Sequence, residues 1–184
     1  MRSPTQPIDN SIANSALSQG TSNAKASPVA LVAELVTPEN FQPFGQVIFP
    51  SEDGTPFGPD DAHLDLSQGI PRFYIMHLDR KGRRFSRITR HQACTQCLGS
   101  LNGEEWLVAV APPNPEQHPN PSDIRAFRIP GNCFIKLDVG TWHAGPYFDQ
   151  AAIDFYNLEL SNTNVIDHDT CSLNAKFGLS FEIT

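Results

Sequence analysis

Residues 85–111 read FSRITRHQACTQCLGSLNGEEWLVAVA, and they combine two patterns that are typical of β-structure. From Phe85 to His91 the residues fall into two alternating sets, which indicates a strand with two different faces. Asn102-Gly103 is the strongest short hairpin signal in the chain, because both residues tolerate a positive φ. The buried-looking run Leu107 to Ala111 follows, so a second strand is expected after the turn.

Short runs of the same kind recur along the chain, and helical periodicity is nearly absent. Strands are expected at 47–49, 73–78, 124–129, 133–137, 152–160 and 177–183. Thr37-Pro38-Glu39 predicts one short N-terminal helical turn, with Thr as the cap and Pro in the first helical position. Residues 51–70 form an acidic loop rich in Gly and Pro. The pattern predicts an all-β sandwich or barrel.

Composition narrows the function classes. The chain has 184 residues and a formal net charge of -7, which disfavours nucleic acid as a partner. It contains no apolar run of about 18 residues, so no membrane span is expected. Four scattered cysteines and the lack of a secretory signal predict a cytoplasmic protein. Residues 1–27 are polar and aperiodic and predict a disordered tail, followed by a single domain at 28–184.

Two conspicuous clusters have plain explanations. Cys94-x-x-Cys97 lacks the further ligands of a zinc site and lies between strands, so packing roles are expected. Seven of the thirteen Lys and Arg residues fall between Arg72 and Arg90, where a solvated turn explains most of them. Arg87 is the exception, because it shares a strand face with Thr89 and His91.

A pair of histidines is the strongest candidate for chemistry. Thr89, His91 and Gln96 can project into a barrel interior, and Gly140-Thr141-Trp142-His143 can bring a second imidazole into the same space. A small barrel can place such paired groups in one cavity. We therefore expect His91 and His143 to lie close together.

The spacing of these residues resembles that of the cupins, which are double-stranded β-helix (jelly-roll) barrels. The first cupin motif corresponds to Thr89-x-His91, Gln96 and Gly103, and the second to Asp138-x-Gly140-x-x-His143. The resemblance implies a site for a divalent metal held by His91, Gln96 and His143. Two of the four ligand positions differ from the cupin pattern, since Thr89 replaces a His and Gln96 replaces a Glu. The loss of a carboxylate should lower the affinity for a metal.

Within the cupins, the chain resembles the ureidoglycolate lyase family over most of its length. The matching stretches are Thr37 to Ile48, Arg90-His91 with Thr95-Gln96, Gly103-Glu104, Leu107 to Ala111, Arg125-Ala126-Phe127, Gly140 to His143 and Asp154-Phe155. The chain departs from the family at Thr89-Arg90-His91-Gln92, where Glu-Arg-His-Pro is common. It also departs at Trp142-His143-Ala144-Gly145-Pro146, where Trp-His-His-Pro is frequent.

This resemblance implies a carbon–nitrogen lyase that splits ureidoglycolate into glyoxylate and urea in purine (allantoin) nitrogen catabolism. His143 is expected as base or acid, with His91 as its partner or as a metal ligand. Gln96 and Thr89 would hydrogen-bond the substrate. Two assignments remain open. Either Lys136 or Arg87 could hold the substrate carboxylate, and Asp154 is either an acid in the cavity or a structural carboxylate.

A second hypothesis comes from the departures at Thr89 and Ala144. It describes a catalytically drifted cupin that acts as a binding or regulatory module for a small carboxylate. In either case the partners expected are a small molecule and a second copy of the chain in a homodimer. His63, His77, His118 and His168 are expected in surface or packing roles, and Trp142 and Phe155 in the core.

Overall fold

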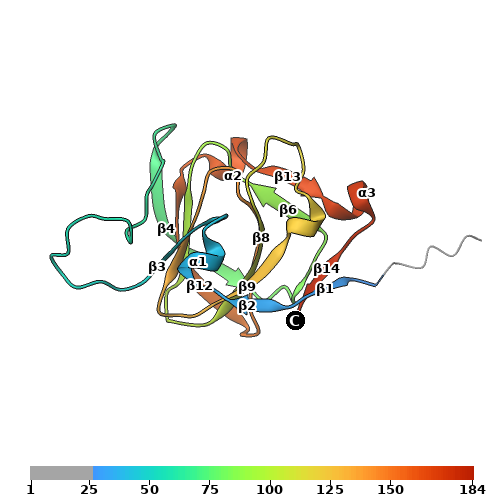
Figure 1. Ribbon diagram of the computed structural model, residues 1–184, viewed down its shortest axis with the longest axis horizontal. Helices are drawn as coiled ribbons and strands as arrows, with labels where there is room; N and C mark the ends of the chain where they lie inside the picture. The colour runs from blue at the N-terminus through green and yellow to red at the C-terminus, as the bar shows by residue number, and fades with distance from the viewer. Residues whose placement is uncertain (1–26) are drawn as a thin grey trace, which may run out of the picture.

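The computed structural model describes residues 27–184, and most of its regular structure is β-strand (Figure 1). The strands are β1 Val29–Leu31, β2 Ala33–Leu35, β3 Gly45–Ile48, β4 Pro71–Asp79, β5 Arg84–Phe85, β6 Arg87–Arg90, β7 Gln96–Ser100, β8 Trp106–Ala111, β9 Arg125–Ile129, β10 Phe134–Leu137, β11 Trp142–Tyr147, β12 Ala152–Leu160, β13 Asp169–Ser172 and β14 Phe181–Ile183. The helices are α1 Pro38–Phe41, α2 Thr163–Ile166 and α3 Leu173–Phe177, with a 3-10 turn at Pro121–Asp123. The tail expected at 1–27 lies outside the described residues except for Ser27.

Two sheets pack face to face around the larger core. One has the strand order β3-β10-β7-β12-β4 and the other β13-β6-β11-β8-β9-β2. Side chains from both sheets meet between them, and Trp106 of β8 packs edge-to-face on Phe155 of β12 with ring centroids 5.2 Å apart. Helix α1 closes one side of this core with the fully buried Phe41.

A second core lies on the other face of the six-stranded sheet. It is covered by the small sheet β1-β14-β5 and by α3, and it contains Ile88, Trp142, Leu173 and Phe181. The six-stranded sheet is therefore buried on both faces over much of its area. Because side chains alternate along a strand, Trp142 of β11 faces this second core and His143 faces the space between the two large sheets.

The expected all-β architecture is confirmed. Helix α1 forms as predicted, because the side chain of Thr37 accepts a hydrogen bond from the backbone of Asn40 while the Asn40 side chain accepts one from the backbone of Thr37. Across residues 27–184, strand pairing gives three open sheets, and they do not close into a barrel. None of the helices described in this range is long and apolar enough to cross a membrane.

The loop predicted between β3 and β4 is present, and it extends from the sheets beside β4 (Figure 1). The side chain of Gln46 holds its middle: Nε2 donates to the carbonyl oxygen of Asp61 at 2.9 Å, and Oε1 accepts from the backbone N–H of His63 at 2.9 Å. Nearer to β4, two hydrogen bonds join Asp65 and Thr95. The backbone N–H of Asp65 donates to the side-chain hydroxyl of Thr95, and the backbone N–H of Thr95 donates to the carbonyl oxygen of Asp65.

The hairpin predicted at Asn102-Gly103 is wrong. Gly103 does have the expected positive φ, at 76°, but β7 and β8 belong to different large sheets. The turn is a crossover between the sheets, since β7 pairs with β10 and β12 while β8 pairs with β9 and β11. Gly131 lies against this turn so closely that a Cβ there would be 1.7 Å from the carbonyl oxygen of Gly103.

We therefore expect Gly131→Ala to destabilise the protein by about 1–3 kcal/mol, because a methyl group has no room beside the backbone of Gly103. Urea unfolding measures the change. Gly58→Ala is the matched control, since a Cβ there would meet its nearest atom, the carbonyl oxygen of Pro56, at 3.7 Å. Equal stability of the two variants would show that the crossover tolerates a wider separation.

Candidate active site

The two histidines singled out by the sequence lie side by side. His143 of β11 is in register with Thr89 of β6 on one side and with Val110 of β8 on the other. Val110 belongs to the core between the large sheets, so the imidazole of His143 faces the same space. His91 follows the end of β6, and its ring centroid is 5.0 Å from that of His143. The expected proximity of the pair is confirmed.

Backbone carbonyls fix the tautomer of each ring. Nδ1 of His91 lies 2.5 Å from the carbonyl oxygen of Asp167, and Nδ1 of His143 lies 3.3 Å from that of Thr141. A carbonyl oxygen only accepts hydrogen bonds, so the Nδ1 atoms carry the protons. The Nε2 atom of each neutral ring then keeps its lone pair and is available as a base.

Both rings are held in the neutral form at pH 7. Burial lowers the pKa of His143 to about 3, and the neighbouring His91 adds to the decrease. Burial also lowers the pKa of His91, but the carbonyl of Asp167 and the charges of Asp167 and Glu159 act in the opposite direction. His91 is therefore the more basic of the two rings in this environment.

A buried amide and carboxylate network adjoins the pair on the five-stranded sheet. Nε2 of Gln96, on β7, donates to Oδ1 of Asn157 at 3.1 Å and to Oε2 of Glu159 at 3.1 Å. Nδ2 of Asn157 also donates to Oε2 of Glu159, at 3.2 Å. All three side chains are buried, with exposed fractions of 7%, 1% and 1%. The Oε1 atom of Gln96 is buried and has no hydrogen-bond partner.

The outer end of the network is closed by residues from β4 and α2. The hydroxyl of Tyr74 donates to Glu159 at 3.3 Å, and Nδ2 of Asn164 donates to it at 3.1 Å. The guanidinium of Arg72 lies 3.9 Å from the carboxylate of Glu159 and 3.6 Å from the ring centroid of Tyr74. Strand register explains this grouping, because Arg72 is opposite Glu159 and Tyr74 is opposite Asn157.

Sequence reasoning singled out Gln96 but missed its partners Asn157 and Glu159, although β12 carries a signal for them. Ile153 and Phe155 occupy the buried positions at the start of the strand, and continuing the alternation puts Asn157 and Glu159 on the same face. Polar residues at two successive buried positions are costly unless they have partners, so they indicate either a structural network or a site.

The six-stranded sheet contributes a second polar group. Oγ1 of Thr89 lies 3.0 Å from Oγ1 of Thr170, which in turn lies 3.2 Å from Nδ1 of His168. The ring of His168 is 5.8 Å from that of His91. His168 is exposed, as expected for a surface residue, but it also forms the outer rim of the histidine pair.

Two of the predicted substrate-binding residues are not brought to the histidines. Lys136 of β10 is buried in an ion pair with Asp138 and is in register with Cys97, so it lies on the outer face of the five-stranded sheet. Asp154 is on the outer face of β12, where Oδ1 lies 2.6 Å from Nδ1 of His77. Arg87 is exposed on the strand face that carries Thr89.

The side chains near the pair fit a divalent metal poorly. No group of three His, Cys, Asp or Glu side chains within residues 27–184 is arranged to hold a metal ion. His91, Gln96 and His143 would offer only neutral donors, with no carboxylate to offset the charge of a divalent ion. The metal set remains a prediction from the cupin spacing.

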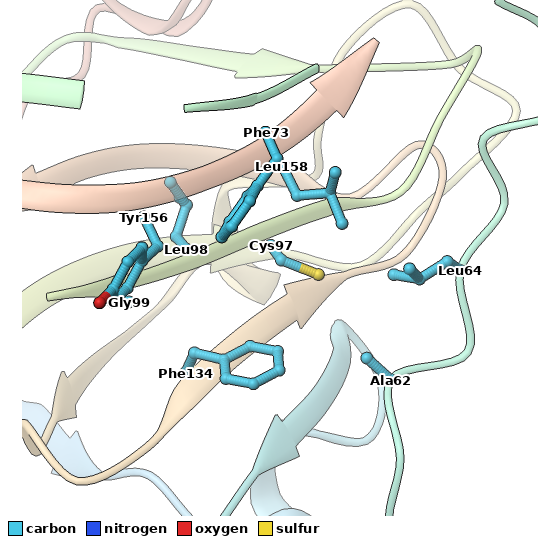
Figure 2. Close-up of a pocket in the computed structure, with 9 residues that line it drawn as sticks. All are labelled: Ala62, Leu64, Phe73, Cys97, Leu98, Gly99, Phe134, Tyr156 and Leu158. Carbon is cyan, nitrogen blue, oxygen red and sulfur yellow. The ribbon is translucent and has the colours of Figure 1, made fainter. Parts of the chain in front are cut away.

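A separate apolar pocket of about 390 Å³ lies on the outer face of the five-stranded sheet. Figure 2 shows the rings of Phe73, Phe134 and Tyr156 and the sulfur of Cys97 among the residues that line it. Its walls are Ala62, Leu64, Phe73, Cys97, Leu98, Gly99, Phe134, Tyr156 and Leu158. These residues include no cation for a carboxylate, and burial raises the pKa of Cys97 to about 12. The pocket is therefore a poor place for acid–base chemistry.

The four cysteines are free and buried, and Cys94 and Cys97 form no disulfide with each other. Burial raises the pKa of Cys94 as it does that of Cys97, so neither thiol is activated for redox or nucleophilic chemistry. The packing role expected for this Cys-x-x-Cys pair is consistent with both observations.

Comparison with known proteins gives two matches. The family model described as ureidoglycolate lyase matches residues 28–178, which include both histidines and the whole buried network. A curated protein from Saccharomyces cerevisiae, named ureidoglycolate lyase, is 26% identical over 150 residues. That alignment covers 63% of this chain and 77% of the yeast protein.

Because the pKa of His143 in the folded state is about 3, its unfolded form binds a proton at a higher pH than its folded form. We expect the free energy of unfolding to fall as the pH is lowered from 7 to 5, since protons then favour the unfolded chain. His143→Gln should flatten this dependence, measured by urea unfolding at several pH values. His63→Gln, a change at an exposed loop histidine, serves as control and should keep the wild-type slope. A wild-type slope in His143→Gln would contradict the assignment.

Proposed function

The chain belongs to the ureidoglycolate lyase family, and we propose from this that it splits ureidoglycolate into glyoxylate and urea through the His91–His143 pair. The observation that carries the proposal is the pair of imidazoles 5.0 Å apart, with Nδ1 of each ring on a backbone carbonyl. Such rings offer two Nε2 lone pairs to one ligand.

The reaction requires a proton to be transferred over a short distance, from the substrate hydroxyl to the ureido nitrogen. Ureidoglycolate carries a hydroxyl and a ureido nitrogen on the same carbon. Removal of the hydroxyl proton lets the oxygen form the C=O bond of glyoxylate while the C–N bond breaks. The electron pair of that bond goes to the nitrogen, which takes up a proton and leaves as urea. A histidine suits both transfers.

His91 is the base in this scheme, and His143 assists it. Nε2 of His91 takes the hydroxyl proton and the resulting imidazolium returns it to the departing nitrogen, so that no proton is gained or lost overall. The carbonyl of Asp167 stabilises this imidazolium, because its oxygen accepts a hydrogen bond from the Nδ1–H group. His143 has a pKa of about 3 and does not retain the proton, so it acts as a neutral hydrogen-bond acceptor.

Arg87 is the residue that we propose to hold the substrate carboxylate. It shares a strand face with Thr89, which is in register with His143. In the described part of the chain Arg87 forms no ion pair with an Asp or Glu. A guanidinium without a competing carboxylate is well suited to bind one from a ligand.

Several wider features belong to the same proposal. The cupin spacing of His91, Gln96, Gly103 and His143 supports the proposal that residues 28–184 form one domain with a cupin-like, double-stranded β-helix order of strands. The family resemblance supports participation in purine nitrogen catabolism and a homodimer, and the scattered cysteines support a cytoplasmic location. The binding-module alternative is not favoured, because the two histidines that the chemistry needs are present and adjacent.

A coupled assay for urea and glyoxylate from racemic ureidoglycolate, corrected for spontaneous decay, tests the activity. His91→Gln should lower kcat by about 10²- to 10⁴-fold, the usual contribution of a positioned acid–base group. His143→Gln should lower it by less. The assay is run with and without chelator, and the melting temperature of each variant is measured. Wild-type kcat in a folded His91→Gln protein would remove His91 from the mechanism.

Arg87→Ala should raise KM by about tenfold with a smaller effect on kcat, since it removes a charge-assisted contact to the carboxylate. Arg84→Ala is the matched control, because Arg84 is an exposed neighbour that pairs with Glu182 in the small sheet. A KM that is unchanged in Arg87→Ala would exclude it as the carboxylate-binding residue.

A further inference from the structure

Gln96 presents a buried acceptor that the protein itself does not use. Its side chain is 7% exposed, and both N–H bonds of its amide point to acceptors on β12, Oδ1 of Asn157 and Oε2 of Glu159. Oε1, on the other side of the amide group, has no hydrogen-bond partner. A buried carbonyl oxygen without a partner is costly, so a donor from a ligand would be strongly preferred there.

Glu159 determines which way this amide faces. A carboxylate accepts hydrogen bonds and donates none, so only the nitrogen of Gln96 can face it. Asn157 is fixed in turn, since its Nδ2 donates to Glu159 and to the hydroxyl of Tyr74, which leaves Oδ1 for Gln96. With Glu159 in place, rotating the Gln96 amide would put oxygen against oxygen at both contacts.

The network also adjoins the reacting groups. The charge of Glu159 acts on the pKa of His91, where it opposes the effect of burial, so the carboxylate lies within electrostatic range of the proposed base. Gln96 begins β7 and shares a strand face with Leu98, which belongs to the core between the two large sheets, so its side chain faces the same space as that of His143. Oε1 of Gln96 is therefore part of the same polar interior as the histidine pair.

We propose that Oε1 of Gln96 accepts a hydrogen bond from the terminal amino group of a ureido ligand, and that Glu159 is the positioning residue that holds it in that orientation. This inference rests on the proposed function for the identity of the ligand. It adds a basis for selectivity, because the site then distinguishes a ureido group from an acyl group of the same shape. A site built to bond a donor rejects the analogue that lacks it.

Two uncleavable probes test the inference by calorimetry. N-carbamoylglycine has the ureido group and the carboxylate but no hydroxyl to deprotonate, and N-acetylglycine replaces its terminal amino group with methyl. The wild-type protein should bind N-carbamoylglycine at least about tenfold more tightly, the value of one hydrogen bond to a buried acceptor. Equal affinity for the two probes, or binding of neither, would overturn the inference.

Two variants separate the acceptor from the residue that positions it. Gln96→Met removes the acceptor and should abolish the preference. Glu159→Gln preserves size but can donate, so the Gln96 amide is free to turn, and most of the preference should be lost while N-acetylglycine binding is retained. Glu105→Gln, at an exposed carboxylate that pairs with Arg128, is the control. A folded Glu159→Gln protein with the full preference would show that Glu159 does not position Gln96.

The binding readout is independent of turnover. If the wild-type protein selects N-carbamoylglycine but does not cleave ureidoglycolate, the inference stands and the proposed lyase activity fails. If it cleaves ureidoglycolate but does not distinguish the probes, the activity stands and the role of Gln96 and Glu159 is rejected. Melting curves of every variant accompany the titrations, and Gln96→Met carries the test if Glu159→Gln does not fold.

Discussion

The six-stranded sheet has to be buried on both faces, and strand β11 shows what this constraint requires. Trp142 points into the core beneath the small sheet and His143 points between the two large sheets, one residue apart. Because alternation allows no other arrangement, a shift of β11 by one residue would exchange the tryptophan and the imidazole. The position of His143 is thus set by the packing of its neighbour, which is fully buried.

The interior between the large sheets divides into an apolar part and a polar part. Trp106, Phe127 and Phe155 fill the first, while Gln96, Asn157 and Glu159 occupy the second together with the histidines. Burying so many polar groups adds little net stability, even when nearly all of them are bonded. Oε1 of Gln96, the single unbonded acceptor among the three side chains, is the atom that we propose for ligand recognition.

The sequence predicted the parts of the fold that depend on local patterns. Alternation indicated most strands, and the Thr37 cap indicated α1, because both signals lie within a few residues. The hairpin prediction failed at Asn102-Gly103. The chain does turn there, but the strands on either side belong to different sheets, and this depends on packing against distant parts of the chain. The histidine pair was foreseen from motif spacing. The sequence left Lys136 and Asp154 open, because alternation alone does not show which face of a strand points inward, and Glu159 was missed because no motif contains it.

The attachment of the long loop by Gln46 has a consequence for how this region can diverge. The side chain of Gln46 bonds to the loop at Asp61 and His63. These bonds divide the long loop into two shorter segments, each with its own anchored ends. The span before the attachment is exposed around Gly54, where an added Cβ would meet no atom within 4 Å, and it can absorb insertions or deletions. The span after it is held between Gln46 and Thr95 and has a nearly fixed length. Related chains should therefore vary in length on one side of the attachment and keep it on the other.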